Sequence, residues 1–250
     1  MSATVCLTVD VEDWYDGMAV LGHPVPRPAG ARSGLGGLLE LLDRAGGASK
    51  VTLFCVGNYV DVVRTDLLAL VEAGHEIAGH GPDHGRLPEE PEKLGAWLRQ
   101  GREMLEDRLG TAVRGFRSPR FDVPAVGLRA YRELLAQAGY EYVSDTSVLG
   151  AGAALRELPV LVANRVCVGG GSYQRVLPAR VLHAAVRRAA SPAVCYYHSY
   201  DFGATLPPLH SIRSVTEAEQ LLGRGRIKSR FSELLTTYGS KACHHVASSV

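Results

Sequence analysis

The chain of 250 residues is long enough for one large α/β domain, and we expect a single domain spanning residues 1–250. Its 27 basic and 26 acidic side chains nearly cancel, which argues against the basic surface of a nucleic-acid-binding protein. The hydrophobic share of 46% indicates a sizeable core, yet no apolar run reaches the roughly 18 residues of a transmembrane helix. The beginning of the chain lacks a signal-peptide pattern, and its five scattered cysteines form no Cys-x-x-Cys pair, so we expect a cytoplasmic protein.

Strand and helix patterns alternate along the chain. Strands are predicted at residues 4–9, 50–57, 76–78, 113–116, 140–143, 158–160, 165–168 and 193–197. Helices are predicted at residues 35–45, 61–73, 91–109, 128–138, 180–190 and 230–238. The Pro- and Gly-rich residues 24–37 are predicted to form a loop, and the polar end after residue 238 is predicted to fray. This alternation favours a mostly parallel sheet, either open or closed into a barrel.

Polar side chains follow five of the predicted strands. They include Asp10, Glu12 and Asp13 after the first strand, then His80 and His84, Arg117 and Arg120, Asp145, and finally His198. Functional groups gather at the carboxyl ends of strands in parallel α/β folds, so these side chains are expected at one rim. Two histidines in a tight turn and one carboxylate would form a three-ligand set with open positions, as in catalytic sites for divalent metals.

Each of these residues also has a structural interpretation when it is taken alone. Carboxylates at strand ends often form turns or cap helices, and two loop histidines are more often exposed than metal-binding. Arg117 has the alternatives of a surface cation and a clamp on a carboxylate, of which a position beside acids favours the clamp. His198 follows a tyrosine-rich strand, where a buried structural histidine is the alternative.

Taken in order, these motifs resemble those of the polysaccharide deacetylases, also called NodB-homology domains or family 4 carbohydrate esterases. The stretches that resemble the five motifs are Thr8–Trp14, Gly74–His84, Gly115–Phe121, Gly139–Ser147 and the segment at His198. Residues 168–178 are similar to a subgroup linked to exopolysaccharide gene clusters. The resemblance covers nearly the whole chain.

The resemblance implies a distorted (β/α) barrel of about seven strands that hydrolyses the acetamide of N-acetylated amino sugars with a divalent metal. Zinc is the favoured metal, with Co²⁺, Ni²⁺ or Mn²⁺ as alternatives. The implied partner is an N-acetylated sugar, whether polymer, oligomer or small glycosylated metabolite. The sequence indicates neither the sugar nor the oligomeric state.

The resemblance also implies roles for individual residues. His80 and His84 would bind the metal together with one acid of the first motif, for which Asp13 is preferred over Glu12. Asp10 would be the general base, held by Arg117, although Glu12 is an alternative base.

His198 would be the general acid, with Asp145 as its partner. Near the substrate, Arg120 replaces the aromatic residue common in the family, and its backbone N–H would face the oxyanion. Trp14 and Tyr173 are candidate aromatic platforms for a sugar ring, with ordinary packing as the alternative.

Two other functions stay open at this level. One is a hydrolase of cyclic amides or imides on the same fold, against which the presence of both His80 and His84 argues. The other is a catalytically silent carbohydrate-binding scaffold, against which the complete set of acid, arginine and histidine residues argues.

Overall fold

A computed structural model describes residues 3–15, 33–122, 124–146, 155–189, 192–203 and 222–249. Seven parallel strands form one sheet in the order β6-β5-β4-β3-β2-β1-β7. They are β1 (Val5–Val11), β2 (Thr52–Cys55), β3 (Glu76–Gly79), β4 (Gly115–Phe116), β5 (Tyr142–Val143), β6 (Arg156–Glu157) and β7 (Ala193–His198). The sheet curls into a half-barrel, which confirms the expected barrel type.

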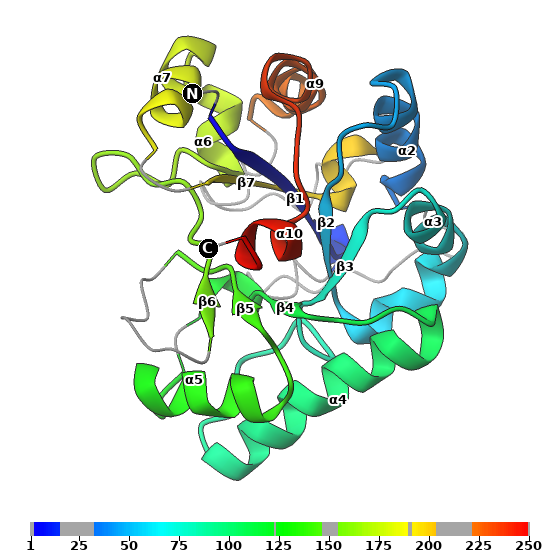
Figure 1. Cartoon of the computed structure of the whole chain (residues 1–250), viewed down its shortest axis with the longest axis vertical. Helices are drawn as coiled ribbons and strands as arrows, with labels where there is room; N and C mark the ends of the chain where they lie inside the picture. Colours follow the sequence, from blue (N-terminus) through cyan, green and yellow to red (C-terminus); the bar gives the residue numbers. More distant parts are fainter. Residues whose placement is uncertain are drawn as a thin grey trace.

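Helices lie around the outside of this curled sheet (Figure 1). They are α2 (Leu35–Arg44), α3 (Val60–Glu72), α4 (Pro91–Leu109), α5 (Leu128–Gln137), α6 (Gly171–Val176), α7 (Ala179–Arg188) and α9 (Ile227–Tyr238). The 3₁₀ turns within the described residues are η1 (Gly57–Tyr59), η2 (Pro119–Phe121), η3 (Ser199–Phe202) and η5 (Arg224–Arg226). Among the described residues, no helix combines the length and apolar character needed to cross a membrane.

The local sequence explains where the longest helix begins and ends. Pro91 stands in the first turn of α4, where its missing N–H leaves no intrahelical bond unmade. Gly110 ends the helix with a left-handed φ of 64°, a conformation that glycine adopts without steric cost. Between them, leucines at helical spacing (Leu94, Leu98 and Leu105) are fully buried, so one face of α4 packs on the core.

Two predicted strands are not strands of the sheet. Residues 158–160 and 165–168 make only isolated bridges, among them Val160 with Val194 and Ala163 with Val166. The Leu161 N–H donates to the Val194 carbonyl, so this segment runs alongside β7 and covers the open side of the half-barrel between β6 and β7. Their apolar character reflects burial against β7 rather than a full ladder.

The end of the chain differs from the predicted frayed tail. Residues Cys243–Ala247 form a short helix, α10, which lies in the middle of the half-barrel in Figure 1. Cys243 is fully buried, and its N–H donates to Thr52 Oγ1 at 2.8 Å. The His244 N–H donates to Glu76, which also accepts from Tyr142. These bonds at the starts of the strands fix α10 in place. Most of the predicted loop at 24–37 lies outside the described residues, and its last part belongs to α2, which begins at Leu35.

A buried neutral histidine makes the stability of the fold depend on pH. His75 Nδ1 accepts the Val51 N–H at 3.2 Å, which requires an unprotonated ring nitrogen. Burial, helped by the Lys50 ammonium, lowers the pKa of His75 from 6.5 to about 4. Between these values the unfolded chain binds a proton at this residue and the folded chain does not.

We therefore expect the melting temperature to fall as pH decreases from about 6.5 to about 4, and part of this fall to be absent from His75→Gln. Thermal unfolding of both proteins across that window measures the difference. An equal loss in the variant and the original chain would contradict the assignment.

Candidate functional site

The parallel sheet brings the predicted site residues to one rim. In the register of β1 and β7, Asp10 is paired with His198, so both lie at the same level of the sheet. The loop that carries His80 follows β3, and Arg117 follows β4 directly. Because all strands run in the same direction, these side chains share the carboxyl edge of the half-barrel.

The loop that carries both histidines has a closely fitted backbone. Gly81 adopts a φ of 83°, and a Cβ atom there would lie 2.3 Å from the ring of Trp97. The Gly57 N–H donates to the Gly81 carbonyl at 2.8 Å, which ties the loop to η1. The turn between His80 and His84 is therefore fixed from two sides before any ligand binds.

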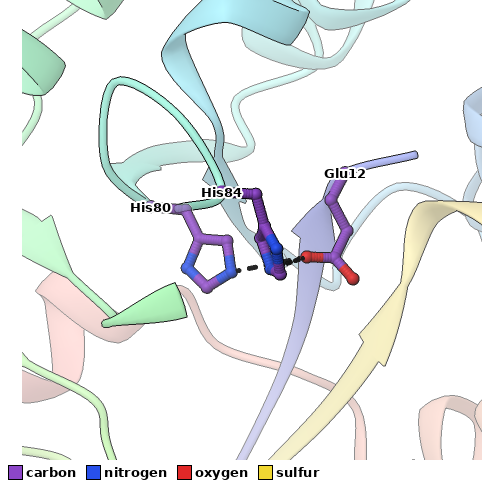
Figure 2. A group of neighbouring side chains, drawn as sticks. All are labelled: Glu12, His80 and His84. Carbon is purple, nitrogen blue, oxygen red and sulfur yellow. Dashed lines mark ion pairs between the residues drawn. The ribbon is translucent and has the colours of Figure 1, made fainter. Parts of the chain in front are cut away.

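Glu12, His80 and His84 form a group of three side chains of the types that bind metal ions, here called the metal-ligating group (Figure 2). One ligand atom from each lies within 4.8 Å of the other two. The Glu12 Oε2 atom contacts His84 Nε2 and lies 3.7 Å from His80 Nε2. Glu12 comes from the end of β1, whereas the two imidazoles come from the loop after β3, so distant segments meet here.

The hydrogen bonds around His80 leave one ring nitrogen available to a ligand. His80 Nδ1 lies 2.9 Å from the Arg117 carbonyl oxygen, which only accepts, so Nδ1 carries the hydrogen. The lone pair is then on Nε2, which faces Glu12. In metal-binding histidines of proteins, a hydrogen bond from the ring nitrogen that does not bind the metal orients the ring and fixes its tautomer.

The electrostatics of Glu12 favour a carboxylate. Burial alone would raise the pKa of Glu12, but the neighbouring imidazoles of His84 and His80 lower it well below its usual value. Two imidazoles and one carboxylate, with further positions open, form the donor set that catalytic Zn²⁺ sites use. The residues present therefore fit a divalent metal.

The preference for Asp13 as the acidic ligand needs correction. The structure brings Glu12, and not its neighbour, to the two imidazoles. Asp13 is buried, and its Oδ1 accepts the Tyr15 N–H at 3.4 Å.

Arg117 is the centre of a second cluster. Its guanidinium is fully buried and pairs with Asp10 Oδ1 at 2.6 Å, as expected for a clamp on that carboxylate. The same group donates to Thr8 Oγ1 at 2.9 Å and to the carbonyl and hydroxyl oxygens of Ser144. It also lies 4.0 Å above the ring centre of Phe54. The rigid plane of the guanidinium thus makes four hydrogen bonds, to β1 and to the residue that follows β5.

Asp145 is not the partner of His198. Its Oδ1 accepts the Ser118 N–H at 2.9 Å, which holds the segment just after Arg117. Burial raises the pKa of Asp145 to about 6. The carboxylate beside His198 is that of Asp201, whose Oδ2 lies 3.4 Å from His198 Nδ1. The sequence pattern does not predict this role for Asp201, although an acid three positions after His198, in the same segment, is a signal that could indicate it.

His198 lies between the metal-ligating group and Asp201. Its Nε2 is 3.8 Å from Glu12 Oε1, and its side chain is 16% exposed. Burial would lower the pKa of His198, but Asp201 and Glu12 outweigh burial and raise it. The Ser199 hydroxyl donates to the Glu12 carbonyl, which ties the end of β7 to the end of β1.

The predicted substrate-binding residues lie in different environments. Trp14 is 5% exposed, with its ring stacked on Tyr200 at 4.2 Å, so packing explains it better than contact with a sugar. Arg120 is exposed and has a left-handed φ of 61° in η2. Tyr173 lies on α6 and is 46% exposed.

Two family models match consecutive parts of the chain. Residues 29–143 match the family described as polysaccharide deacetylase, and residues 137–248 match a domain of unknown function, DUF3473. The peptidoglycan deacetylase-like protein FGM2 of Gibberella zeae is 34% identical over 125 residues. The match covers 50% of this chain and 35% of that relative, so the chain spans about a third of the relative's length.

Solved structures share the fold at low sequence identity. A Mycobacterium smegmatis protein assigned as a polysaccharide deacetylase has a TM-score of 0.66 and 21% identity, covering 99% of this chain and 91% of its own. A family 4 acetyl xylan esterase from Clostridium thermocellum, solved with cobalt, has a TM-score of 0.52 and 17% identity, covering 98% and 90%. The family 4 pseudoenzyme BA3943 from Bacillus anthracis has a TM-score of 0.56 and 14% identity, covering 98% and 66%. Because active and inactive proteins share this fold, function must be argued from the site.

The adjacent acids Glu12 and Asp13 provide a matched pair of variants. We expect Glu12→Gln to weaken Zn²⁺ binding by more than about 10-fold. A loss of about 10-fold already follows when a residue that merely supports a ligand is replaced, and Glu12 is a proposed ligand itself. Asp13→Asn should bind Zn²⁺ as the original chain does. Calorimetric titration of the metal-free proteins measures both affinities, and the reverse order would restore Asp13 as the ligand.

Proposed function

The chain belongs to the polysaccharide deacetylase family, and on that premise we propose that it is a metal-dependent N-deacetylase. Its substrate would be an N-acetylated amino sugar, hydrolysed to the free amine and acetate. The observation that carries the proposal is the convergence of Glu12, His80 and His84 beside the Asp10–Arg117 pair and His198. We also propose that residues 1–250 form one catalytic domain, because strands from both matched regions belong to one sheet.

The proposed metal site consists of Glu12, His80 and His84. A divalent cation bound there would supply Lewis-acid activation of the acetamide carbonyl and of a water molecule. Zn²⁺ suits two imidazoles and one carboxylate best, and Co²⁺, Ni²⁺ and Mn²⁺ are alternatives. The location in the cytoplasm stays a prediction from the sequence.

Two residues of the chain would move protons. Asp10, held as a carboxylate by the Arg117 guanidinium at 2.6 Å, would accept a proton from the attacking water. His198 would donate a proton to the amine as it leaves, because an amide nitrogen is a poor leaving group until it is protonated. The raised pKa of His198 keeps more of its ring in the charged, donating form near neutral pH.

The segment after Arg117 would complete the site. The backbone N–H of Arg120 is the proposed donor to the oxyanion of the tetrahedral intermediate. Its left-handed φ of 61° and the bond from the Ser118 N–H to Asp145 set the path of the chain at this point. The exposed side chain of Arg120 is then the part that would contact the sugar.

The proposal is tested by measuring acetate release. Metal-free protein is reconstituted with Zn²⁺ and incubated with N-acetylhexosamine oligomers, nucleotide sugars and small acetamide-bearing glycosides. We expect acetate from at least one of these classes, loss of the activity on chelation, and recovery when metal is added back. Glycan binding without acetate from any substrate would instead support a silent carbohydrate-binding scaffold.

Variants separate metal binding from proton transfer. His80→Ala and His84→Ala should lose metal binding and turnover together, because each removes a proposed ligand. Asp10→Asn and His198→Ala should keep the metal and lower kcat by about 100-fold or more, the range that one acid or base contributes. Metal content by elemental analysis and kcat from acetate release distinguish the two groups. Metal loss in His198→Ala would contradict its assignment as the acid.

A further inference from the structure

A buried ion pair lies directly behind His198. Arg175 Nη2 is 2.9 Å from Asp201 Oδ1, and the two side chains are 1% and 2% exposed. The other carboxylate oxygen, Asp201 Oδ2, accepts the His198 N–H at 3.0 Å and lies 3.4 Å from His198 Nδ1. One carboxylate therefore joins an arginine on α6 to both the backbone and the ring of His198.

Aromatic rings hold the face of the same imidazole. The ring of Tyr200 lies 4.8 Å from that of His198 and is nearly parallel to it, at an angle of 5°. Trp14 stacks on Tyr200 at 4.2 Å, and the Arg224 guanidinium lies 4.6 Å from the centre of the Trp14 ring. His198 is thus fixed by Asp201 at one edge and by Tyr200 on its face.

The charges of this group depend on one another. Burial would raise the pKa of Asp201, but His198 and Arg175 outweigh burial and lower it, so the carboxylate stays ionised. A buried charge whose partner has been removed is strongly unfavourable, whereas a matched pair is tolerated. Without Arg175, a neutral Asp201 or a rearranged side chain would be favoured, and the hold on His198 would weaken.

Both members of the ion pair lie in residues 137–248, the part matched by the domain of unknown function. His198 and Tyr200 lie in this part as well. The three metal-ligating residues and the Asp10–Arg117 pair lie before it. The second part of the chain therefore brings the proposed acid and its surroundings to a metal site that the first part forms.

We propose that Asp201 and Arg175 are positioning residues that orient His198 toward the substrate amide. This inference rests on the proposed function, since it assigns an orienting role around the proposed acid. Neither residue touches the reacting atoms; each acts through the ring of His198. The role of the region of unknown function is, on this account, to supply and orient the proton donor.

A double-mutant cycle tests the proposal. Asp201→Asn and Arg175→Met should each lower kcat about 10-fold or more, part of the contribution of an oriented acid, with KM and bound Zn²⁺ nearly unchanged. In the His198→Ala background the same substitutions should have little further effect on kcat, because the group they orient is gone. Arg175→Lys, which keeps the charge, should recover part of the loss.

A matched control is the ion pair between Arg132 and Glu157, which lies at β6, the edge of the sheet opposite β7. Arg132→Met removes a partly buried arginine of the same kind and should leave kcat unchanged. Melting temperatures identify any variant that fails to fold. If Arg175→Met fails to fold, the test rests on Asp201→Asn, which keeps the shape of the side chain.

Two results would overturn the proposal: losses that persist in full in the His198→Ala background, or loss of metal from the Asp201 and Arg175 variants. A separate readout does not depend on activity. The crystal structure of Asp201→Asn should show the His198 ring displaced from its stack on Tyr200, and an unmoved ring would count against positioning. If the original chain releases no acetate, the proposed function fails, while this structure still decides whether the pair positions His198.

Discussion

The site depends on the buried guanidinium of Arg117. This cation has no access to water, so it persists only because Asp10 balances its charge and Thr8 and Ser144 accept further hydrogen bonds from it. The backbone carbonyl of the same residue accepts from His80 Nδ1, which directs the other ring nitrogen toward Glu12. A single residue therefore orients both the proposed base and one proposed metal ligand. Any substitution that removes its charge would leave a buried carboxylate unpaired next to the metal-ligating group.

The two halves of the chain meet at this rim in different roles. The first half supplies the proposed metal ligands and the Asp10–Arg117 pair, and its backbone is fixed by close contacts such as that of Gly81 with Trp97. The second half supplies His198 at the end of β7, which pairs with β1 on one side and meets residues 160–170 through isolated bridges on the other. At the end of this strand, the ion pair of Asp201 with Arg175 and the stack on Tyr200 fix the side chain of His198.

Sequence patterns predict the fold well where a strand is buried on both faces. The mostly apolar residues of β1 and the acids at its end indicate both the strand and the position of the site. Sequence patterns predict secondary structure less well where the backbone pairs through isolated bridges rather than a regular ladder. Residues 158–168 are apolar because they pack along β7, and periodicity alone does not separate such a segment from a strand. The docked helix α10 is not predicted for a similar reason: its five residues are held by Thr52 and Glu76 from distant strands.

The choice between adjacent acids shows the same limit at the site. Asp13 and Glu12 both carry a carboxylate and both follow β1. Only the path of the chain beyond β1 decides which carboxylate meets the imidazoles. Asp201, and not Asp145, is the carboxylate beside His198 because η3 turns back on the end of β7. No strand pattern in the sequence indicates this turn. The most direct test of the account is anomalous diffraction from crystals soaked in Zn²⁺. We predict a peak about 2 Å from Glu12, His80 and His84 together. Zinc bound elsewhere, with these three side chains unchanged, would contradict the metal site on which the proposed chemistry depends.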